Sequence, residues 1–144
     1  MIKEKFKRQK NYFSEHLILD LYDCLPNTVG DLQKCYLFLD DLATVLKAEK
    51  LSPPFIVFTD EKKYPDKAGL SGWIPLFDLE TNRYFGSSIH TLTSTNFISI
   101  DIYYCTKNSS SYKTTVKRFV LNIFKPKKVE EKYFLRGENY SVGK

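Results

Sequence analysis

The chain has 144 residues, of which 42% are hydrophobic, and a formal net charge of +5, which suits one ordinary domain with a sizeable core. No apolar run reaches the roughly 20 residues of a membrane span, and the start MIKEKFKRQK has no apolar signal segment, so we expect a cytoplasmic protein. Cys24, Cys35 and Cys105 show no CxxC spacing, which argues against a disulfide framework and a structural zinc site. We therefore expect three reduced thiols and no metal.

Basic residues gather near both ends of the sequence, at 3–10 and 113–128. Such a balance is compatible with an anionic partner, but no nucleic-acid-binding signature accompanies it. Solvated lysines on a soluble protein are the simpler interpretation, and a small phosphate-bearing ligand is the alternative.

Residues 1–13 are predicted to be a basic, flexible arm, residues 14–138 a single domain, and residues 139–144 a C-terminal tail. The domain begins with EHLILDLYDC, whose alternating leucines are typical of a strand with one buried face. We interpret His16 as the residue at which this strand starts, without a functional role.

A helix is predicted next, within DLQKCYLFLDDLATVLKAEK, with Asp31 as its N-cap. Its apolar side chains recur at helical spacing. They are Leu32, Cys35, Tyr36, Leu39, Leu42 and Leu46. Cys35 is therefore expected to be a core residue rather than a ligand.

The middle of the chain predicts four strands, followed by a second amphipathic helix within SYKTTVKRFVLNIF and a last strand within VEEKYFL. The four strands are FIVFTD, WIPLFDL, SSIHTLT and NFISIDIYYC. Pro75 interrupts the second of them, which indicates an edge strand or a bulge, because proline cannot donate to a sheet.

This order of elements predicts the α+β class, as a two-layer sandwich of a mainly antiparallel β-sheet with two helices packed on one face. The other face would then be open to a ligand or a partner subunit. Alternation within NFISIDIYYC puts Asp101, Tyr103 and Cys105 opposite the isoleucines, and Ser88 shares a face with His90. If these strands pair, one mostly polar surface holds all five residues.

His90 and Cys105 are chemically suited to act together. An imidazole titrates near neutrality, and it can activate a nearby thiol for proton transfer or nucleophilic attack. With two histidines and three cysteines in the chain, a chance arrangement is the competing interpretation.

Five short motifs follow one another in a recognisable order. They are HLILDLYDC, GLSG at 69–72, SIHT at 88–91, DIYYC ending at Cys105, and RG at 136–137. Together they resemble the small prokaryotic S-adenosylmethionine decarboxylases, whose sequences carry HLI-DLYGC, GVTG, ESH followed by SIHT, a VDIFTC-like strand and a late RG. The resemblance runs from His16 to Gly137, and the interval from His90 to Cys105 matches it.

The resemblance implies roles for several residues. In the family, the serine of ESH cleaves its own chain and leaves a pyruvoyl group, which serves as the electron sink for loss of CO2. The histidine matching His90 assists that cleavage, and the cysteine matching Cys105 donates a proton. An aromatic residue ahead of the GVTG turn stacks on adenine, and Tyr64 is the nearest match here. Family members assemble through their sheets, which implies a homo-oligomer.

The chain departs from the family at the cleavage site. Counting back from His90, the family's glutamate and serine fall on Tyr84 and Phe85. Phe85 has no hydroxyl for the acyl shift, so an uncleaved chain without a pyruvoyl group is expected. The alternative is cleavage at a displaced hydroxyl, at Thr81 paired with Glu80, at Ser87 or at Ser88.

The function predicted from this departure is a pyruvoyl-free lyase. The carboxylate of S-adenosylmethionine can displace its own thioether, giving homoserine lactone and methylthioadenosine, and an enzyme need only fold the substrate and exclude water. We expect Tyr103, Asp101 or Glu80 to hold the ribose or the amino group, with His90 and Cys105 lining the pocket beside Ser88 and Tyr64.

The charge of +5 adds a second possibility for the substrate, because S-adenosylmethionine is itself a cation. A nucleotide conjugate such as SAM-AMP carries an additional phosphodiester that lysines could bind. Such conjugates are signals in some antiviral defence systems, where a lyase would end the signal. The alternatives are a decarboxylase with a shifted cleavage site and a non-catalytic regulator that binds the metabolite or a decarboxylase subunit.

Overall fold

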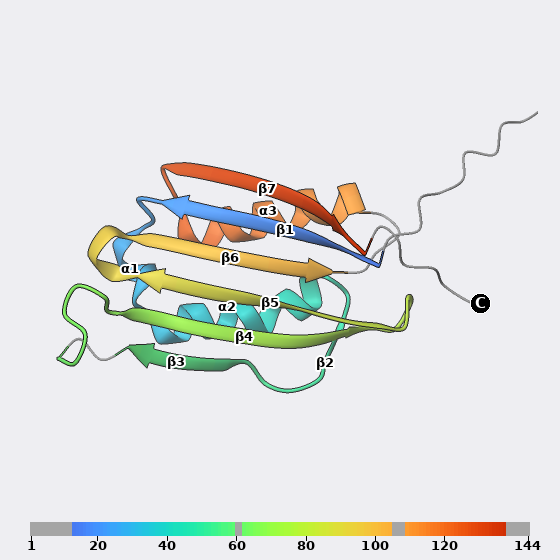
Figure 1. Ribbon diagram of the computed structural model, residues 1–144, viewed down its shortest axis with the longest axis horizontal. Helices are drawn as coiled ribbons and strands as arrows, with labels where there is room; N and C mark the ends of the chain where they lie inside the picture. The colour runs from blue at the N-terminus through green and yellow to red at the C-terminus, as the bar shows by residue number, and fades with distance from the viewer. Residues whose placement is uncertain (1–12, 60–61, 105–108, 138–144) are drawn as a thin grey trace, which may run out of the picture.

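The computed structural model describes residues 13–59, 62–104 and 109–137, and it shows two layers (Figure 1). An antiparallel sheet forms one layer, and α2 (Leu32–Val45) and α3 (Ser109–Phe124) lie together behind it in Figure 1. The predicted α+β class and the two-layer sandwich with helices on one face are thus confirmed. No helix of the described part of the chain is long and apolar enough to cross a membrane.

The sheet has seven strands in the order β2-β4-β5-β6-β1-β7, with β3 also paired to β4. Their bounds are β1 Ser14–Tyr22, β2 Glu49–Lys50, β3 Phe55–Thr59, β4 Gly69–Asp78, β5 Arg83–Leu92, β6 Phe97–Tyr104 and β7 Lys128–Arg136. The sequence did not predict β2, α1 (Pro26–Val29) or the 3-10 turn η1 (Thr93–Thr95). Each has only two to four residues, too few to show a period.

The core lies between the sheet and the two long helices. Leu17, Leu19 and Leu21 of β1 are fully buried, as are Ile98, Ile100 and Ile102 of β6, so the predicted alternation in both strands is confirmed. The helix α3 contributes Val116, Val120 and Phe124 to the same cluster. Every second residue of these strands therefore faces the opposite side of the sheet, which no helix of the described residues covers and which we call the outer face.

The buried stripe of α2 differs in phase from the prediction. Phe38 is fully buried and stacks on Phe119 of α3, whereas Leu32 is 47% exposed and Tyr36 is 36% exposed. The difference arises because α2 contacts both the sheet and α3. The helix is therefore rotated so that the large Phe38 side chain lies in the core. Asp31 is the predicted N-cap and accepts a hydrogen bond from the Lys34 amide at 2.9 Å.

Pro75 lies in an interior strand, so the prediction of an edge or a bulge is wrong. β4 pairs with β5 in unbroken register from Ser71 opposite His90 to Asp78 opposite Arg83. The carbonyl of Pro75 accepts a hydrogen bond from the Leu51 amide, which lies between β2 and β3. The missing N–H of proline therefore faces the gap between two short strands, where no ladder bond is lost.

Candidate functional site

The register of the sheet sets which side chains are neighbours on the outer face. The first row across β4, β5, β6 and β1 consists of Trp73, Ser88, Asp101 and Ile18. The next row contains Gly86, Tyr103 and His16. Segments far apart in the sequence thus bring aromatic, acidic and imidazole side chains to one place on the outer face.

A hollow of about 570 Å³ lies over these two rows, within the size range of small-molecule sites. We call it the outer hollow. It is lined by His16, Trp73, Tyr84, Phe85, Gly86, Ser87, Ser88, Asp101 and Tyr103. Trp73 and Tyr84 expose 51% and 69% of their surface, so large ring faces are available beside the polar groups.

Gly86 shapes the floor of the hollow. A Cβ atom at this position would lie 2.6 Å from the Ile74 carbonyl oxygen and 3.4 Å from Nε1 of Trp73. The glycine therefore lets β4 and β5 approach and keeps the space beside the indole open.

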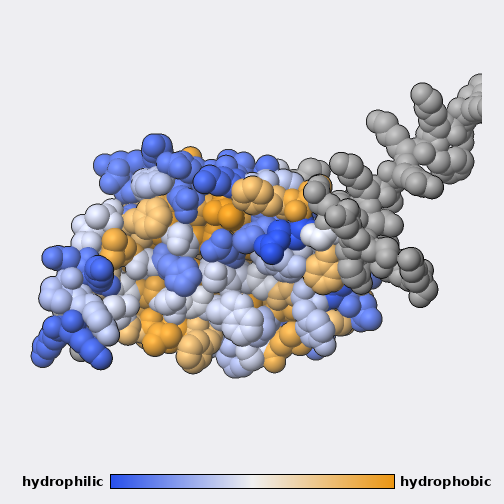
Figure 2. Space-filling model, viewed as in Figure 1, coloured by the Kyte–Doolittle hydropathy of each residue, from blue (hydrophilic) through white to orange (hydrophobic). Residues whose placement is uncertain are grey.

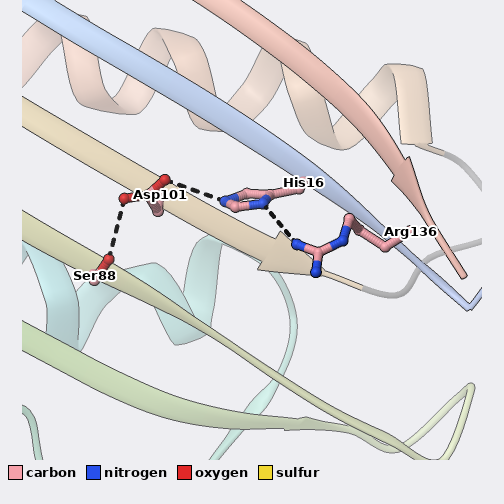
Figure 3. A network of polar contacts seen from close by, with 4 residues as sticks. All are labelled: His16, Ser88, Asp101 and Arg136. Atoms are coloured by element: carbon pink, nitrogen blue, oxygen red, sulfur yellow. Dashed lines mark hydrogen bonds and ion pairs between the residues drawn. The ribbon is translucent and has the colours of Figure 1, made fainter.

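A chain of polar contacts crosses the outer hollow, as Figure 3 shows. His16 Nε2 lies 3.2 Å from Asp101 Oδ1, and the second carboxylate oxygen accepts a long hydrogen bond of 3.5 Å from the Ser88 hydroxyl. On the other side of the imidazole, Nδ1 lies 3.3 Å from an amino group of Arg136. The carboxylate is thus held from two strands while 39% of its side chain stays exposed.

Arginines flank one end of the outer hollow. Arg136 lies 5.7 Å from the ring centre of Tyr103, and Arg83 lies 5.3 Å from that of Phe13. Arg83 also donates a hydrogen bond to the Phe13 carbonyl, and the Phe13 ring lies 6.4 Å from that of Tyr103. This end of the hollow is therefore positive, whereas its centre carries the Asp101 carboxylate.

The structure brings Ser88, Asp101 and Tyr103 together, as the strand alternation predicted. His90 lies on the same face, but its Nδ1 forms a 2.7 Å hydrogen bond with the Ser71 hydroxyl, outside the lining of the hollow. His90 is four positions along the strand from Gly86, which is opposite Tyr103, a distance of about 13 Å. A role for His90 in proton transfer stays a prediction.

Two other predicted site residues, Glu80 and Tyr64, do not line the hollow. Glu80 lies in the turn between β4 and β5, where its amide donates to Asp78 Oδ1 at 3.0 Å. Tyr64 lies in the loop before β4, with the Lys63 ammonium 5.4 Å from its ring centre. Cys105 lies outside the described residues, so its pairing with His90 stays a prediction.

Sequence reasoning missed four residues that line the hollow and one that contacts it through an imidazole. They are His16, Trp73, Tyr84 and Gly86, and then Arg136. His16 was set aside as a strand start, although it opens the HLILDLYDC motif and shares the outer face with Ile18 and Asp20. Arg136 could also have been found from the sequence, because it belongs to the RG motif. Trp73 could be found only with the register that puts it opposite Ser88.

The GLSG motif has a packing role. A Cβ on Gly69 would lie 1.8 Å from the Thr91 carbonyl oxygen, and one on Gly72 would lie 2.8 Å from the Ile56 side chain and 3.0 Å from that of Leu39. These glycines let β4 fit closely against β5 and against α2. The motif thus sets the position of Trp73 without forming part of the hollow.

Two cysteines have no access to the outer hollow. Cys35 is fully buried in α2 and Cys24 is 2% exposed, and burial is the main cause that raises their thiol pKa values to about 12 and about 11. Among the described residues, no three histidine, cysteine or carboxylate side chains are grouped to hold a metal ion. The described chemistry is therefore that of aromatic rings, one carboxylate, one imidazole and the two arginines.

Two adjacent serines of β5 have opposite environments. Ser87 is 2% exposed on the helix side, and its hydroxyl has no hydrogen-bond partner among the described residues. Ser88 faces Asp101 across the outer face. Phe85 is 9% exposed and belongs to the core cluster, and Thr81 donates to Asp78 Oδ2 in the β4–β5 turn at 2.7 Å.

Comparison with known proteins agrees with this architecture. The adenosylmethionine decarboxylase of Aquifex aeolicus VF5 superposes with a TM-score of 0.69 at 18% identity, covering 88% of this chain and 92% of that one, which shows the same fold. The complex of the toxic C-terminal tip of CdiA from Pseudomonas aeruginosa with its immune protein matches at 8% identity over 83% and 86% of the two chains, and its TM-score of 0.36 carries no weight. No curated protein matches the sequence significantly. The family model of S-adenosylmethionine decarboxylase matches residues 15–137, and the chain therefore belongs to this family.

Proposed function

We propose that the chain is a pyruvoyl-free lyase that converts S-adenosylmethionine, or a phosphate-bearing derivative of it, to a methylthioadenosine product and homoserine lactone. The observation that carries this proposal is Phe85, which stands where the family resemblance calls for the self-cleaving serine. The outer hollow supplies groups suited to the substrate without that serine.

The residues around position 85 do not fit a pyruvoyl group. Phe85 has no hydroxyl and packs into the core. Ser87 is buried on the helix side, away from Asp101 and His16. Within the part of the chain that the structure describes, the Ser88 hydroxyl on the outer face has only Asp101 at hydrogen-bond distance. The proposed reaction therefore does not use a pyruvoyl group.

The hollow suits a sulfonium that also carries an amino group. Trp73, Tyr84 and Tyr103 offer ring faces, which attract a cation, and they can also stack on adenine. The Asp101 carboxylate is the group we expect to bind the substrate ammonium. These contacts would fold the methionine chain so that its own carboxylate faces the carbon next to sulfur.

The proposed reaction is an intramolecular displacement. A carboxylate oxygen of the substrate forms a bond to its Cγ while the bond from Cγ to sulfur breaks, and sulfur keeps the electron pair as a neutral thioether. The opposite charges of carboxylate and sulfonium cancel as the reaction proceeds. A site that excludes water favours this step, because water stabilises the separated charges of the substrate more than the transition state.

The positive end of the hollow supports a phosphate-bearing substrate. Arg83 and Arg136 come from different strands and lie beside the aromatic side chains of Phe13 and Tyr103. A phosphodiester attached to the adenosine could bind there, because guanidinium groups bind phosphate oxygens in a bidentate manner. Faster turnover of SAM-AMP than of S-adenosylmethionine would support this form of the proposal, whereas equal turnover would contradict it.

The test combines intact mass with product analysis. The purified chain should give one 16.9 kDa species, and incubation with S-adenosylmethionine or SAM-AMP should release homoserine lactone without CO2. Two fragments together with CO2 would instead establish the alternative, a decarboxylase with a shifted cleavage site. Binding without any product would leave a regulator that binds the metabolite.

We also propose that the chain forms a homo-oligomer. Apolar side chains lie along the edge of the molecule that β3 forms, whereas the side chains over β7 are mostly hydrophilic (Figure 2). Phe55 and Phe58 of β3 expose 66% and 61% of their surface, more than a strand of a monomer usually leaves in water. Light scattering after size exclusion should give a multiple of 16.9 kDa, and a monomer would contradict this proposal.

A further inference from the structure

We infer that Arg136 is a positioning residue, which fixes the tautomer of His16 and thereby makes Asp101 the anionic group of the outer hollow. An amino group of Arg136 lies 3.3 Å from His16 Nδ1. A guanidinium has only donors, so Nδ1 must accept. The proton of the neutral imidazole then lies on Nε2, which is 3.2 Å from Asp101 Oδ1 and donates to it.

The two other protonation states of His16 conflict with these contacts. A proton on Nδ1 alone would point toward the Arg136 donor and leave the lone pair of Nε2 facing the Asp101 carboxylate. An imidazolium would keep the bond to Asp101, but its Nδ1 proton would also meet the guanidinium, and two cations would be adjacent. Arg136 also lies 5.7 Å from the ring centre of Tyr103, a second contact that orients its plane.

The tautomer has a consequence for ligand binding. Both ring nitrogens of His16 are engaged, by Arg136 and by Asp101, so neither is left to form a hydrogen bond with a bound molecule. Asp101 Oδ1 is occupied by His16, whereas Oδ2 has, among the described residues, only the long 3.5 Å bond from Ser88. Oδ2 is therefore the acceptor for a ligand ammonium, with Arg136 acting through His16. The identity of that ligand as S-adenosylmethionine rests on the proposed function, but the tautomer does not.

Nuclear magnetic resonance of the unliganded, full-length chain tests the tautomer directly. The chain has two histidines, so a His90→Gln variant assigns the remaining ring nitrogens to His16. We expect a protonated Nε2 and an unprotonated Nδ1 at neutral pH. A proton on Nδ1 would overturn the inference, whether the ring is neutral or charged.

Substitution of Arg136 tests whether this residue is the cause. Arg136→Met should give a mixture of tautomers, and Arg136→Lys, which keeps a donor, should restore most of the Nε2–H form. An unchanged tautomer in Arg136→Met would overturn the inference. If Arg136→Met does not fold, as judged by circular dichroism, the Arg136→Lys and wild-type spectra still decide.

A binding measurement connects the tautomer to the ligand. Arg136→Met should weaken binding of S-adenosylmethionine by about tenfold, the effect of one charge-assisted hydrogen bond, and Arg136→Lys should recover it. The control is Arg118→Met, which removes one positive charge from α3, far from the outer face. This variant should leave binding unchanged. Absence of binding by the wild type, with the expected tautomer, would reject the proposed function and not this inference.

Discussion

The two sides of β5 differ sharply in burial and in chemistry. Phe85, Ser87 and Ile89 are buried on the helix side, although Phe85 and Ser87 also border the hollow, whereas Gly86 and Ser88 lie on the outer face. The helix side is governed by packing, and the outer side carries the groups with possible chemistry. One residue of displacement along this strand therefore exchanges a core position for a site position.

The largest effect should come from the packing side. Ile89 is fully buried at the centre of the sheet, so Ile89→Ala should lower the free energy of unfolding by about 3 kcal/mol through lost burial and a cavity. His90→Ala, one residue later and exposed, is the matched control. Urea denaturation checks both, and equal losses would contradict the division of the strand into two sides.

The next effect should be on activity. Asp101→Asn keeps the shape of the side chain and removes the charge, so lyase activity or ligand binding should fall by about thirtyfold through loss of a charge-assisted contact. The control is Asp20→Asn, because Asp20 lies on the outer face of β1, opposite Ser99. Comparable losses in both variants would show that general charge, rather than the hollow, binds the ligand.

A smaller effect on stability should follow from filling the floor of the hollow. Gly86→Ala introduces a Cβ that would lie 2.6 Å from the Ile74 carbonyl oxygen, which should cost about 1–2 kcal/mol through strain between β4 and β5. Ligand binding should weaken as well, since the methyl group lies beside Trp73. Unchanged stability together with unchanged binding would show that the floor has no functional role.

The smallest effect should distinguish the adjacent serines. The Ser87 hydroxyl is buried without a partner among the described residues, so Ser87→Ala should change stability by less than about 1 kcal/mol and in the stabilising direction. Ser88→Ala should leave stability unchanged and reduce binding slightly. If either variant converts a two-fragment protein into an intact chain, that serine is the cleavage site and the lyase proposal is rejected.

Most of the fold was predictable because burial imposes a period on the sequence. The alternating isoleucines of β6 gave the correct inward face, and the order of long elements followed from similar patterns. The phase of α2 was not predictable, since it depends on Phe119 of α3, which the helix meets only in the folded protein. Pro75 shows the same limit, because its tolerance depends on where β2 ends and β3 begins.

The site was predictable only within single strands. Ser88, Asp101 and Tyr103 followed from alternation, but the contact between His16 and Asp101 joins residues 85 positions apart and requires the pairing of β1 with β6. Trp73 likewise depends on the register of β4 with β5. The SIHT motif drew attention to His90, but in the structure this residue lies well away from Gly86 and Tyr103.

The contact at Phe13 also guides how the protein can be labelled. The Phe13 amide donates to the carbonyl oxygens of Arg136 and Gly137, at 2.8 and 3.3 Å, so the first and last described residues meet beside Tyr103. A fluorophore or affinity tag attached near either of these residues would start next to the outer hollow and could compete with a ligand. Probes are better attached at the turn around Ser94, at the opposite end of β5, where they would report on the fold without touching the hollow.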